Sequence, residues 1–204
     1  MNAAWSGPVL VADVGGTHVR FALVDVAAAD PLIGASARRF RAAEFASFGA
    51  AVQRYLDESG THPAALVIAA AGVVDDGEVR LTNNVPWVIS RDAIAAGFGF
   101  AEVALLNDFA AMALAVSLLQ PRDLHAVGTP APVPFDARRR QTFAILGAGT
   151  GLGVGALIVR EGYAHALETE GGHASFAPGT AEEIDIYRRF SARFGRVSHE
   201  RALC

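Results

Sequence analysis

Four short motifs in this chain combine glycine with side chains that can bind charge or exchange protons. Adjacent glycines lack a Cβ atom, so their backbone N–H groups can approach an anion such as a phosphate closely. Carboxylate, amide and imidazole groups can accept protons or form hydrogen bonds with hydroxyl groups. The motifs are Asp13–Thr17, Asn107-Asp108, Gly147–Gly153 and Glu170–His173. Two of them are therefore candidate phosphate cradles, and the other two are candidate groups for a ligand that carries hydroxyls.

Each motif also has a purely structural explanation, which for Gly147–Gly153 is a flexible glycine turn between two strands. Asp and Asn are preferred helix N-caps, and for Asn107-Asp108 taken alone we favour this explanation. Glu170 and His173 flank a glycine turn that suits surface residues equally well, and a metal pair is a weak alternative without a third ligand nearby. The first loop fits a plain hairpin, although an aspartate such as Asp13 is costly in an apolar strand unless it has a partner. Glu200 alone is typical of the first turn of a helix.

The second loop and the basic residues limit how a nucleotide could be held. The loop does not fit a dinucleotide-binding fingerprint, because Leu152 and Val154 stand where a third glycine would be needed. All 17 basic residues are arginine. The absence of lysine excludes a Walker A loop, the strand lysine of protein kinases and Schiff-base chemistry in this chain. A nucleotide must therefore be held mainly by backbone amides and a metal ion.

Composition indicates a soluble protein of the cytoplasm. The net charge of −4 gives no general attraction to nucleic acid, and Arg138–Arg140 fits a local solvated loop. The single cysteine, Cys204, rules out an intrachain disulfide and fits a reducing compartment. No signal-peptide pattern or membrane helix is evident, so we expect no membrane partner.

Apolar runs and turn residues predict a mixed α/β sheet, because strand–turn–strand units are followed by helical crossovers. The clearest helix start is Thr180, which forms a capping-box pattern with Glu183. The other predicted helices cover about 45–59, 90–96 and 109–119. The predicted strands cover about 9–14, 19–26, 34–41, 64–71, 78–82, 103–106, 142–146 and 154–160.

Taken together and in this order, the motifs resemble the bacterial glucokinase family, which are ATP-dependent hexose kinases of the hexokinase/actin-like superfamily. The resemblance runs from about Val9 to Leu203. It implies an actin-like ATPase (ribonuclease H-like) α/β fold, with a small N-terminal α/β domain at 1–108 and an incomplete large domain at 109–204. The matching stretches are Ala12–Thr17, Leu106–Phe109, Gly147–Gly153, Glu170–His173 with Phe176–Pro178, and Val197–Arg201.

The resemblance also implies a role for each motif in the phosphorylation of glucose at its 6-hydroxyl. Asp108 would be the general base, and Asp13 would hold Mg²⁺ through a water molecule. The sugar would be bound by Asn107, Asp108, Gly151, Glu170, His173 and Glu200. The ATP phosphates would be bound by Ala12, Asp13, Val14, Gly15, Gly16, Thr17, Gly149, Thr150 and Gly151.

Two departures from the family pattern leave alternatives open. His18 stands where the family commonly has asparagine, and Asn84 matches the family's Asn-x-x-Trp segment only in one alignment of Asn83-Asn84.

Family members continue well beyond Cys204 with an adenine-binding part, so we expect a C-terminally truncated glucokinase. The alternatives are a kinase for another hexose and a non-catalytic sugar-binding or interaction protein. The expected partners are glucose and ATP, and a homodimer is an assembly that the resemblance allows.

Overall fold

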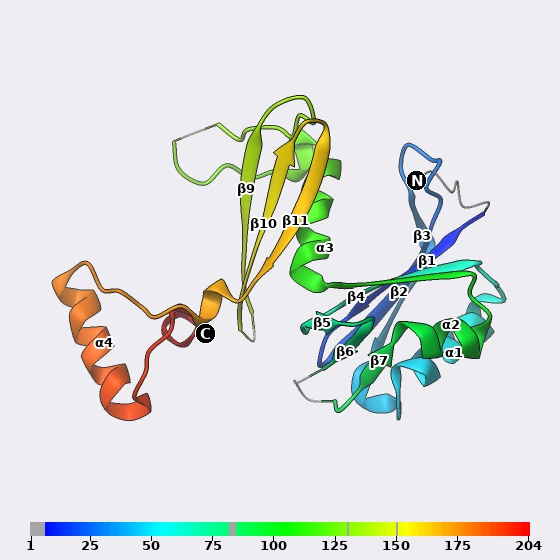
Figure 1. Ribbon diagram of the computed structural model, residues 1–204, viewed down its shortest axis with the longest axis horizontal. Helices are drawn as coiled ribbons and strands as arrows, with labels where there is room; N and C mark the ends of the chain where they lie inside the picture. The colour runs from blue at the N-terminus through cyan, green and yellow to red at the C-terminus, as the bar shows by residue number, and fades with distance from the viewer. Residues whose placement is uncertain (1–6, 82–84, 130, 150) are drawn as a thin grey trace. The chain divides into compact units, whose positions relative to one another are not determined.

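The computed structural model describes residues 7–81, 85–129, 131–149 and 151–204. The chain divides into two compact units, Met1–Asp108 and Phe109–Cys204, which are described in turn (Figure 1). Asn83, Asn84 and Thr150, which figure in the sequence-based expectations, lie outside the described residues. No helix in the described part of the chain is long and apolar enough to cross a membrane.

The first unit is built on a five-stranded sheet with the order β3-β2-β1-β4-β8. β1 pairs antiparallel with β2, and β2 with β3, whereas β1, β4 and β8 run parallel. The strands are β1 (Val9–Val14), β2 (His18–Val24), β3 (Leu32–Arg41), β4 (Ala65–Ala70) and β8 (Glu102–Asn107). A small antiparallel sheet contains β5 (Val74–Asp75), β6 (Glu78–Arg80) and β7 (Val88–Ser90). This arrangement is the mixed sheet that the sequence predicts.

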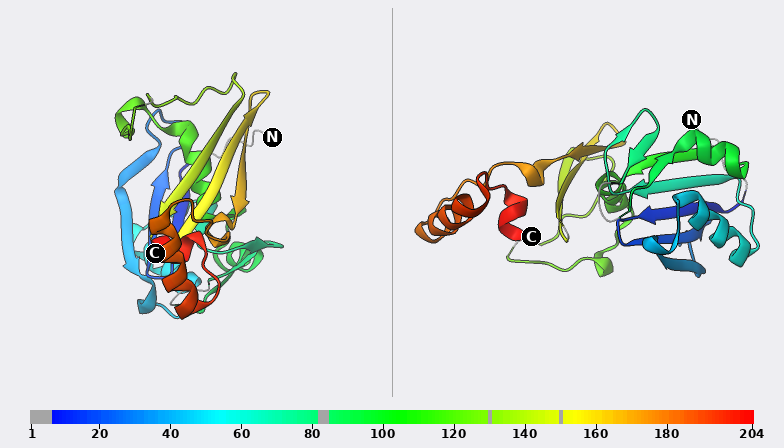
Figure 2. Two further views of the ribbon diagram at one scale, coloured as in Figure 1. Left: turned by 90° about the vertical axis from the view of Figure 1, so that its left-hand side faces the viewer. Right: turned by 90° about the horizontal axis from the view of Figure 1, so that it is seen from below.

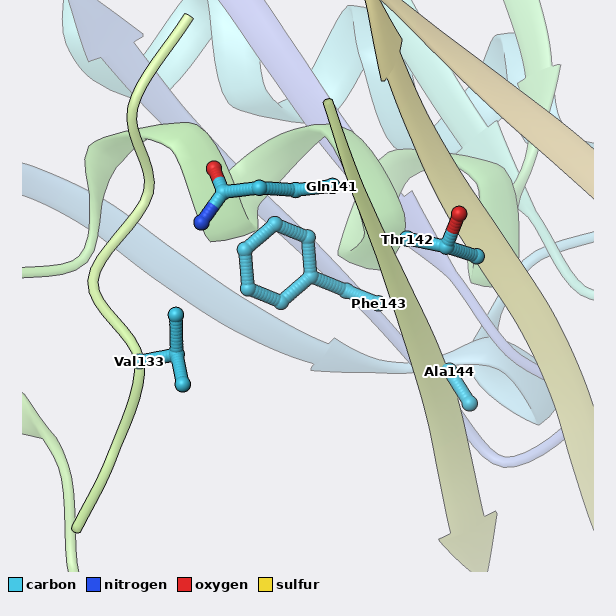
Figure 3. A pocket seen from close by; sticks show the side chains of 5 residues that line it. All are labelled: Val133, Gln141, Thr142, Phe143 and Ala144. Carbon is cyan, nitrogen blue, oxygen red and sulfur yellow. The ribbon is translucent and has the colours of Figure 1, made fainter. Parts of the chain in front are cut away.

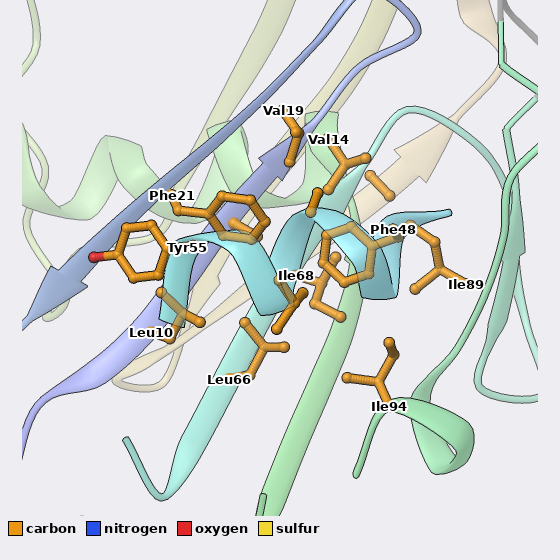
Figure 4. Close-up of a cluster of buried hydrophobic side chains, with 14 of the residues drawn as sticks. Leu10, Val14, Val19, Phe21, Phe48, Tyr55, Leu66, Ile68, Ile89 and Ile94 are labelled. Atoms are coloured by element: carbon orange, nitrogen blue, oxygen red, sulfur yellow. The ribbon is translucent and has the colours of Figure 1, made fainter. Parts of the chain in front are cut away.

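Two capped helices accompany the sheet, and one of them packs its aromatic residues into the core. α1 (Phe48–Ser59) begins after the N-cap Ser47 and ends at Gly60, whose φ of 61° suits glycine. α2 (Arg91–Phe98) begins after the N-cap Ser90, and a 3₁₀ turn covers Ala42–Glu44. The ring of Phe21 lies 5.9 Å from that of Phe48 and 5.2 Å from that of Tyr55, all three fully buried (Figure 4). This core packs α1 against one face of the sheet.

The second unit contains an antiparallel sheet of β9 (Gln141–Ala148), β10 (Leu152–Arg160) and β11 (Tyr163–Thr169). A small core gathers Ala113 from α3 (Asp108–Ala115) with Ile145, Leu157 and Val159 of the sheet. Shorter 3₁₀ turns lie at Val116–Leu118, Pro121–Asp123 and Gly171–His173. α5 (His199–Leu203) ends the chain.

The amphipathic helix predicted from Thr180 is present as α4 (Ala181–Phe194), with the capping box formed by Thr180 and Glu183. Its apolar face does not join a core: α4 has no buried residue. Figures 1 and 2 show it standing away from the β9–β11 sheet of the same unit. The guanidinium groups of Arg193 and Arg201 each lie 4.7 Å from the centre of the Phe194 ring, which they partly cover.

Several element boundaries differ from the predictions for local reasons. The first helix starts at Phe48 instead of Phe45, because the Ser47 side chain accepts a hydrogen bond from the Ala50 N–H and so caps it. The helix predicted to reach Leu119 loses α-helical geometry after Ala115. The sequence patterns do not predict β5, β7 or β11, and they indicate α5 only through Glu200, which lies in its first turn. β11 follows a two-residue turn, Glu161-Gly162, whose φ angles of 52° and 82° are typical of a type I′ hairpin.

Candidate functional site

The first glycine loop is a closed hairpin turn at the carboxyl end of β1. The Gly15 N–H donates to the His18 carbonyl at 3.0 Å, and the Ala42 N–H donates to the Thr17 carbonyl at 2.9 Å. A Cβ placed on Gly15 would meet only the His18 oxygen, at 3.7 Å, which is an ordinary contact. Packing within the described residues therefore does not require glycine at this position, and the space beside it is compatible with an anion.

Asp13 lies on the exposed face of the sheet and is not embedded in the core. It stands directly opposite Arg20 in the register of β1 and β2 and forms an ion pair with it. The two side chains are 52% and 54% exposed, so solvent and a hydrated cation can reach both. The partner that an aspartate in an apolar strand requires is thus supplied by the neighbouring strand.

Among the described residues, no group of three or more His, Cys, Asp or Glu side chains could hold a metal ion. Mg²⁺ is commonly held by one or two carboxylates together with phosphates of the substrate, and it keeps several waters. Asp13, accessible and beside the first loop, is a suitable single carboxylate for such an ion.

Asn107 and Asp108 lie at the same edge of the sheet as the first loop. β8 ends at Asn107 and α3 begins at Asp108. β1, β4 and β8 are parallel, so their carboxyl ends meet at one edge, where α/β proteins bind ligands. The Asn107 side-chain amide donates to the Gly72 carbonyl, just after β4, at 3.0 Å. This hydrogen bond therefore links the end of β8 to the residues that follow β4.

Phe109 accounts for part of the second glycine motif, a role that the sequence did not reveal. Gly147 and Gly153 face each other across β9 and β10. A Cβ on Gly147 would come within 2.8 Å of the Phe109 ring, and one on Gly153 within 1.8 Å. These two glycines make room for an aromatic side chain, so their presence is not by itself evidence for an anion site.

The other two glycines of this loop have separate surroundings. A Cβ on Gly149 would meet nothing within 4 Å, whereas one on Gly151 would lie 2.5 Å from Glu200 Oε2. The Gly149 N–H donates to the Gly151 carbonyl at 2.8 Å and closes the turn. Gly149 is therefore the position open to a phosphate, and Gly151 is the position that admits Glu200.

Three polar side chains that the sequence analysis selected for the sugar lie together in the second unit. His173 Nδ1 is 3.5 Å from Glu170 Oε2, and His173 Nε2 is 3.3 Å from Glu200 Oε1. The second oxygen of Glu200 accepts a hydrogen bond from the Leu152 N–H at 3.0 Å. Glu170, His173 and Glu200 are 68%, 59% and 33% exposed, which leaves the cluster accessible to a ligand. We refer to Gly151, Glu170, His173 and Glu200 as the hydroxyl-binding cluster, after the role that the resemblance implies for them.

Backbone contacts hold this cluster in place. A Cβ on Gly172 would lie 2.0 Å from the Leu152 carbonyl oxygen, so the turn between Glu170 and His173 requires glycine there. The His199 N–H donates to the Ala174 carbonyl at 3.0 Å, which brings the start of α5 beside the turn. Arg196 Nη2 donates to the His173 carbonyl at 2.7 Å. Sequence reasoning missed Arg196, because no spacing distinguishes it from the other arginines.

The second unit also has an open pocket of about 450 Å³ at the start of β9 (Figure 3). It is lined by Val133, Gln141, Thr142, Phe143 and Ala144. None of these belongs to the motifs, so this pocket is separate from the candidate site.

Comparison with known proteins identifies the family to which the chain is similar. The family model for glucokinase matches residues 10–204. The glucokinase of Stenotrophomonas maltophilia (strain K279a) is 52% identical over 202 residues, which cover 99% of this chain and 60% of that protein. The chain thus spans about three fifths of the length of this curated relative.

Solved structures show the same fold. The crystal structure of a glucokinase from an Antarctic psychrotroph matches with a TM-score of 0.76 and 31% identity, covering 95% of this chain and 59% of that one. A glucokinase from Balamuthia mandrillaris in complex with glucose matches with a TM-score of 0.71 at 20% identity, covering 97% and 60%. The predicted α/β, actin-like fold is confirmed. By its sequence and its fold, the chain belongs to the glucokinase family.

Proposed function

We propose that this chain carries the sugar-binding and phosphate-binding parts of an enzyme that transfers the terminal phosphoryl group of ATP to the 6-hydroxyl of glucose. The observation that carries the proposal is the hydroxyl-binding cluster, in which His173 lies between the carboxylates of Glu170 and Glu200. Carboxylates accept hydrogen bonds from hydroxyl donors, and an imidazole nitrogen can donate or accept one. A hexose presents several hydroxyls close together and so suits this set.

In the proposed reaction Asp108 takes the proton of the 6-hydroxyl. The hydroxyl oxygen forms a bond to the γ-phosphorus of ATP while the bond to the β–γ bridging oxygen breaks, which gives glucose 6-phosphate and ADP. Its position at the carboxyl edge of the sheet, beside the first loop, supports Asp108 in this role. Asn107, fastened to Gly72, would hold a neighbouring hydroxyl.

Phosphoryl transfer depends mainly on positioning and on stabilising charge that is spread over the phosphate oxygens. Backbone N–H groups of Gly15–Thr17 and of Gly149 would bind these oxygens. Mg²⁺, held by Asp13 through water, would supply positive charge at the phosphates. Because the chain has no lysine, these groups would supply the phosphate contacts that a lysine makes in other nucleotide-binding loops.

The test measures glucose 6-phosphate formation from ATP and glucose, in this chain and in a form extended to the length of its relatives. Asp108→Asn should lower kcat by about 10²–10⁴-fold, the usual contribution of a general base, and change glucose affinity little. An Asp108→Asn enzyme with near-normal turnover would remove Asp108 as the base. A full-length form that makes no glucose 6-phosphate would refute the proposed activity.

A second candidate is a non-catalytic sugar-binding protein. It is favoured by one observation: the hydroxyl-binding cluster is formed wholly by residues 151–200 and does not include Asp108, the proposed base. Calorimetry separates the two functions. Glucose binding without ATP binding or turnover, in both the short and extended forms, would support the second candidate. A substrate panel would identify another preferred hexose.

A further inference from the structure

A group of basic side chains lies on β2 and β3, next to the first loop. In the register of the sheet, Arg20 stands opposite Arg39 and His18 stands opposite Arg41. Successive side chains of a strand alternate between its faces, so Arg39 and Arg41 lie on one face and Arg38 on the other. We refer to His18, Arg20, Arg39 and Arg41 as the basic cluster.

Only part of the positive charge in this cluster is balanced. Arg20 forms an ion pair with Asp13. Within the part of the chain that the structure describes, neither Arg39 nor Arg41 forms a salt bridge. Arg38, by contrast, donates to the backbone carbonyls of Ala35 and Ala37 at 3.0 and 2.9 Å. Two guanidinium groups on the Asp13 face therefore remain available for an anion.

His18 lies against this charge, which disfavours its protonated form. Arg39 Nη2 is 3.1 Å from His18 Nε2 and 3.3 Å from Nδ1. Partial desolvation, followed by the charges of Arg39, Arg20 and Arg41, lowers the pKa of His18 from its ordinary value. A neutral imidazole keeps one N–H that can donate to a phosphate oxygen.

The cluster is tied directly to the first loop. His18 follows Thr17 in the chain, and the Ala42 N–H, next to Arg41, donates to the Thr17 carbonyl at 2.9 Å. Like charges placed directly opposite each other destabilise a sheet. An alternative explanation is that the charged residues on the edge strand β3 simply prevent it from pairing with a strand of another chain. That explanation accounts for charge on β3, but not for the alignment of Arg39 and Arg41 with Arg20 and His18 beside the loop.

We propose that Arg39 and Arg41, with His18, bind phosphate oxygens of the nucleoside triphosphate whose phosphate chain lies in the first loop. This inference rests on the proposed function for the identity of the anion. The cluster supplies side-chain cations to a loop that otherwise offers backbone N–H groups. Guanidinium groups suit this role, because they form paired hydrogen bonds with phosphate oxygens.

The experiment is a calorimetric titration of the 204-residue chain with inorganic tripolyphosphate and, separately, with ATP, at low and at physiological salt. Arg39→Gln and Arg41→Gln should each weaken tripolyphosphate binding about tenfold, equivalent to about 1.4 kcal/mol, and the double variant about a hundredfold. Arg38→Gln is the matched control, since it removes the same charge from the other face of the same strand. Thermal unfolding of every variant checks the fold, and Arg39→Lys should restore part of the affinity.

The possible results divide clearly. If the wild-type chain binds no tripolyphosphate, or if Arg38→Gln weakens binding as much as Arg39→Gln and Arg41→Gln, the inference is wrong and the cluster is surface charge. If binding depends on Arg39 and Arg41 but the full-length protein makes no glucose 6-phosphate, the anion site stands and the proposed function fails. Turnover in the full-length protein, with unchanged tripolyphosphate binding in the double variant, would support the proposed function and refute the anion site.

Discussion

Gly151→Ala should weaken sugar binding while leaving the fold intact. The added Cβ would lie 2.5 Å from Glu200 Oε2, which is too close for any real contact. The atom in the way is the end of a flexible side chain, so the carboxylate should move and the backbone should stay. Glu200 would then lose its hydrogen bond from the Leu152 N–H and its contact with His173 Nε2.

The magnitude follows from these contacts. A hydrogen bond to a charged group contributes about 1.5–3 kcal/mol when it is protected from solvent. Because Glu200 is 33% exposed, water can replace part of the lost bond, and the free energy of unfolding should fall by only about 1 kcal/mol. Displacing the carboxylate removes one charged acceptor for a sugar hydroxyl. The Kd for glucose should therefore rise roughly 10- to 100-fold.

The assay is calorimetric titration with glucose, combined with denaturant unfolding of the same samples. Gly149→Ala is the matched control, because a Cβ there would meet nothing within 4 Å and should change neither measurement. If Gly151→Ala binds glucose with wild-type affinity, the placement of Glu200 in the sugar site is refuted. If Gly149→Ala weakens glucose binding as strongly, the steric reasoning about Gly151 fails instead.

Two further predictions concern stability. Gly153→Ala places a Cβ 1.8 Å from the Phe109 ring and should lower the free energy of unfolding by about 1–3 kcal/mol, as overpacking does; a denaturant midpoint equal to that of Gly149→Ala would contradict the packing of Phe109. Hydrogen bonds from the Gly179 and Thr180 N–H groups lower the pKa of Glu183 below its ordinary value. The folded form therefore binds its proton less readily than the unfolded form, so this contribution to α4 is present at neutral pH and is lost as the pH falls through the carboxyl range. The helical signal in the far-ultraviolet circular dichroism of the chain should fall with pH in the wild type and fall much less in Glu183→Gln. An identical pH profile in both proteins would argue against the cap.

Much of the fold could be predicted because it depends on local chemistry. The hairpin at Gly15, the cap at Ser90 and the capping box at Thr180 follow from residues within a few positions of one another. The unpredicted β11 is an edge strand of the small sheet. Its pairing with β10 depends on the turn at Glu161-Gly162, and a glutamate in the sequence does not indicate a positive φ, because non-glycine residues rarely adopt one.

The candidate site was harder to predict, since its geometry depends on contacts between distant segments. Glu170 and His173 share a short turn that the sequence displays. Glu200 joins them through contacts between distant segments, among them the hydrogen bonds from the His199 N–H to the Ala174 carbonyl and from the Leu152 N–H to Glu200, and no periodicity encodes those contacts. Glycine spacing does not reveal the role of each glycine either. Gly153 leaves room for the Phe109 ring, whereas a Cβ on Gly149 would meet nothing within 4 Å, yet the sequence shows the same residue type at both.

The hydrogen bond from the Leu152 N–H to Glu200 has a thermodynamic consequence for the two ligands of the proposed reaction. Leu152 continues directly from the loop that contains Gly149 and Gly151, so any sugar that repositions Glu200 would change the restraint on the loop that is proposed to bind phosphate. Such coupling is reciprocal by linkage: the factor by which glucose alters phosphate affinity must equal the factor by which phosphate alters glucose affinity. Through one carboxylate oxygen, the binding of each substrate would thus change the affinity for the other by the same factor.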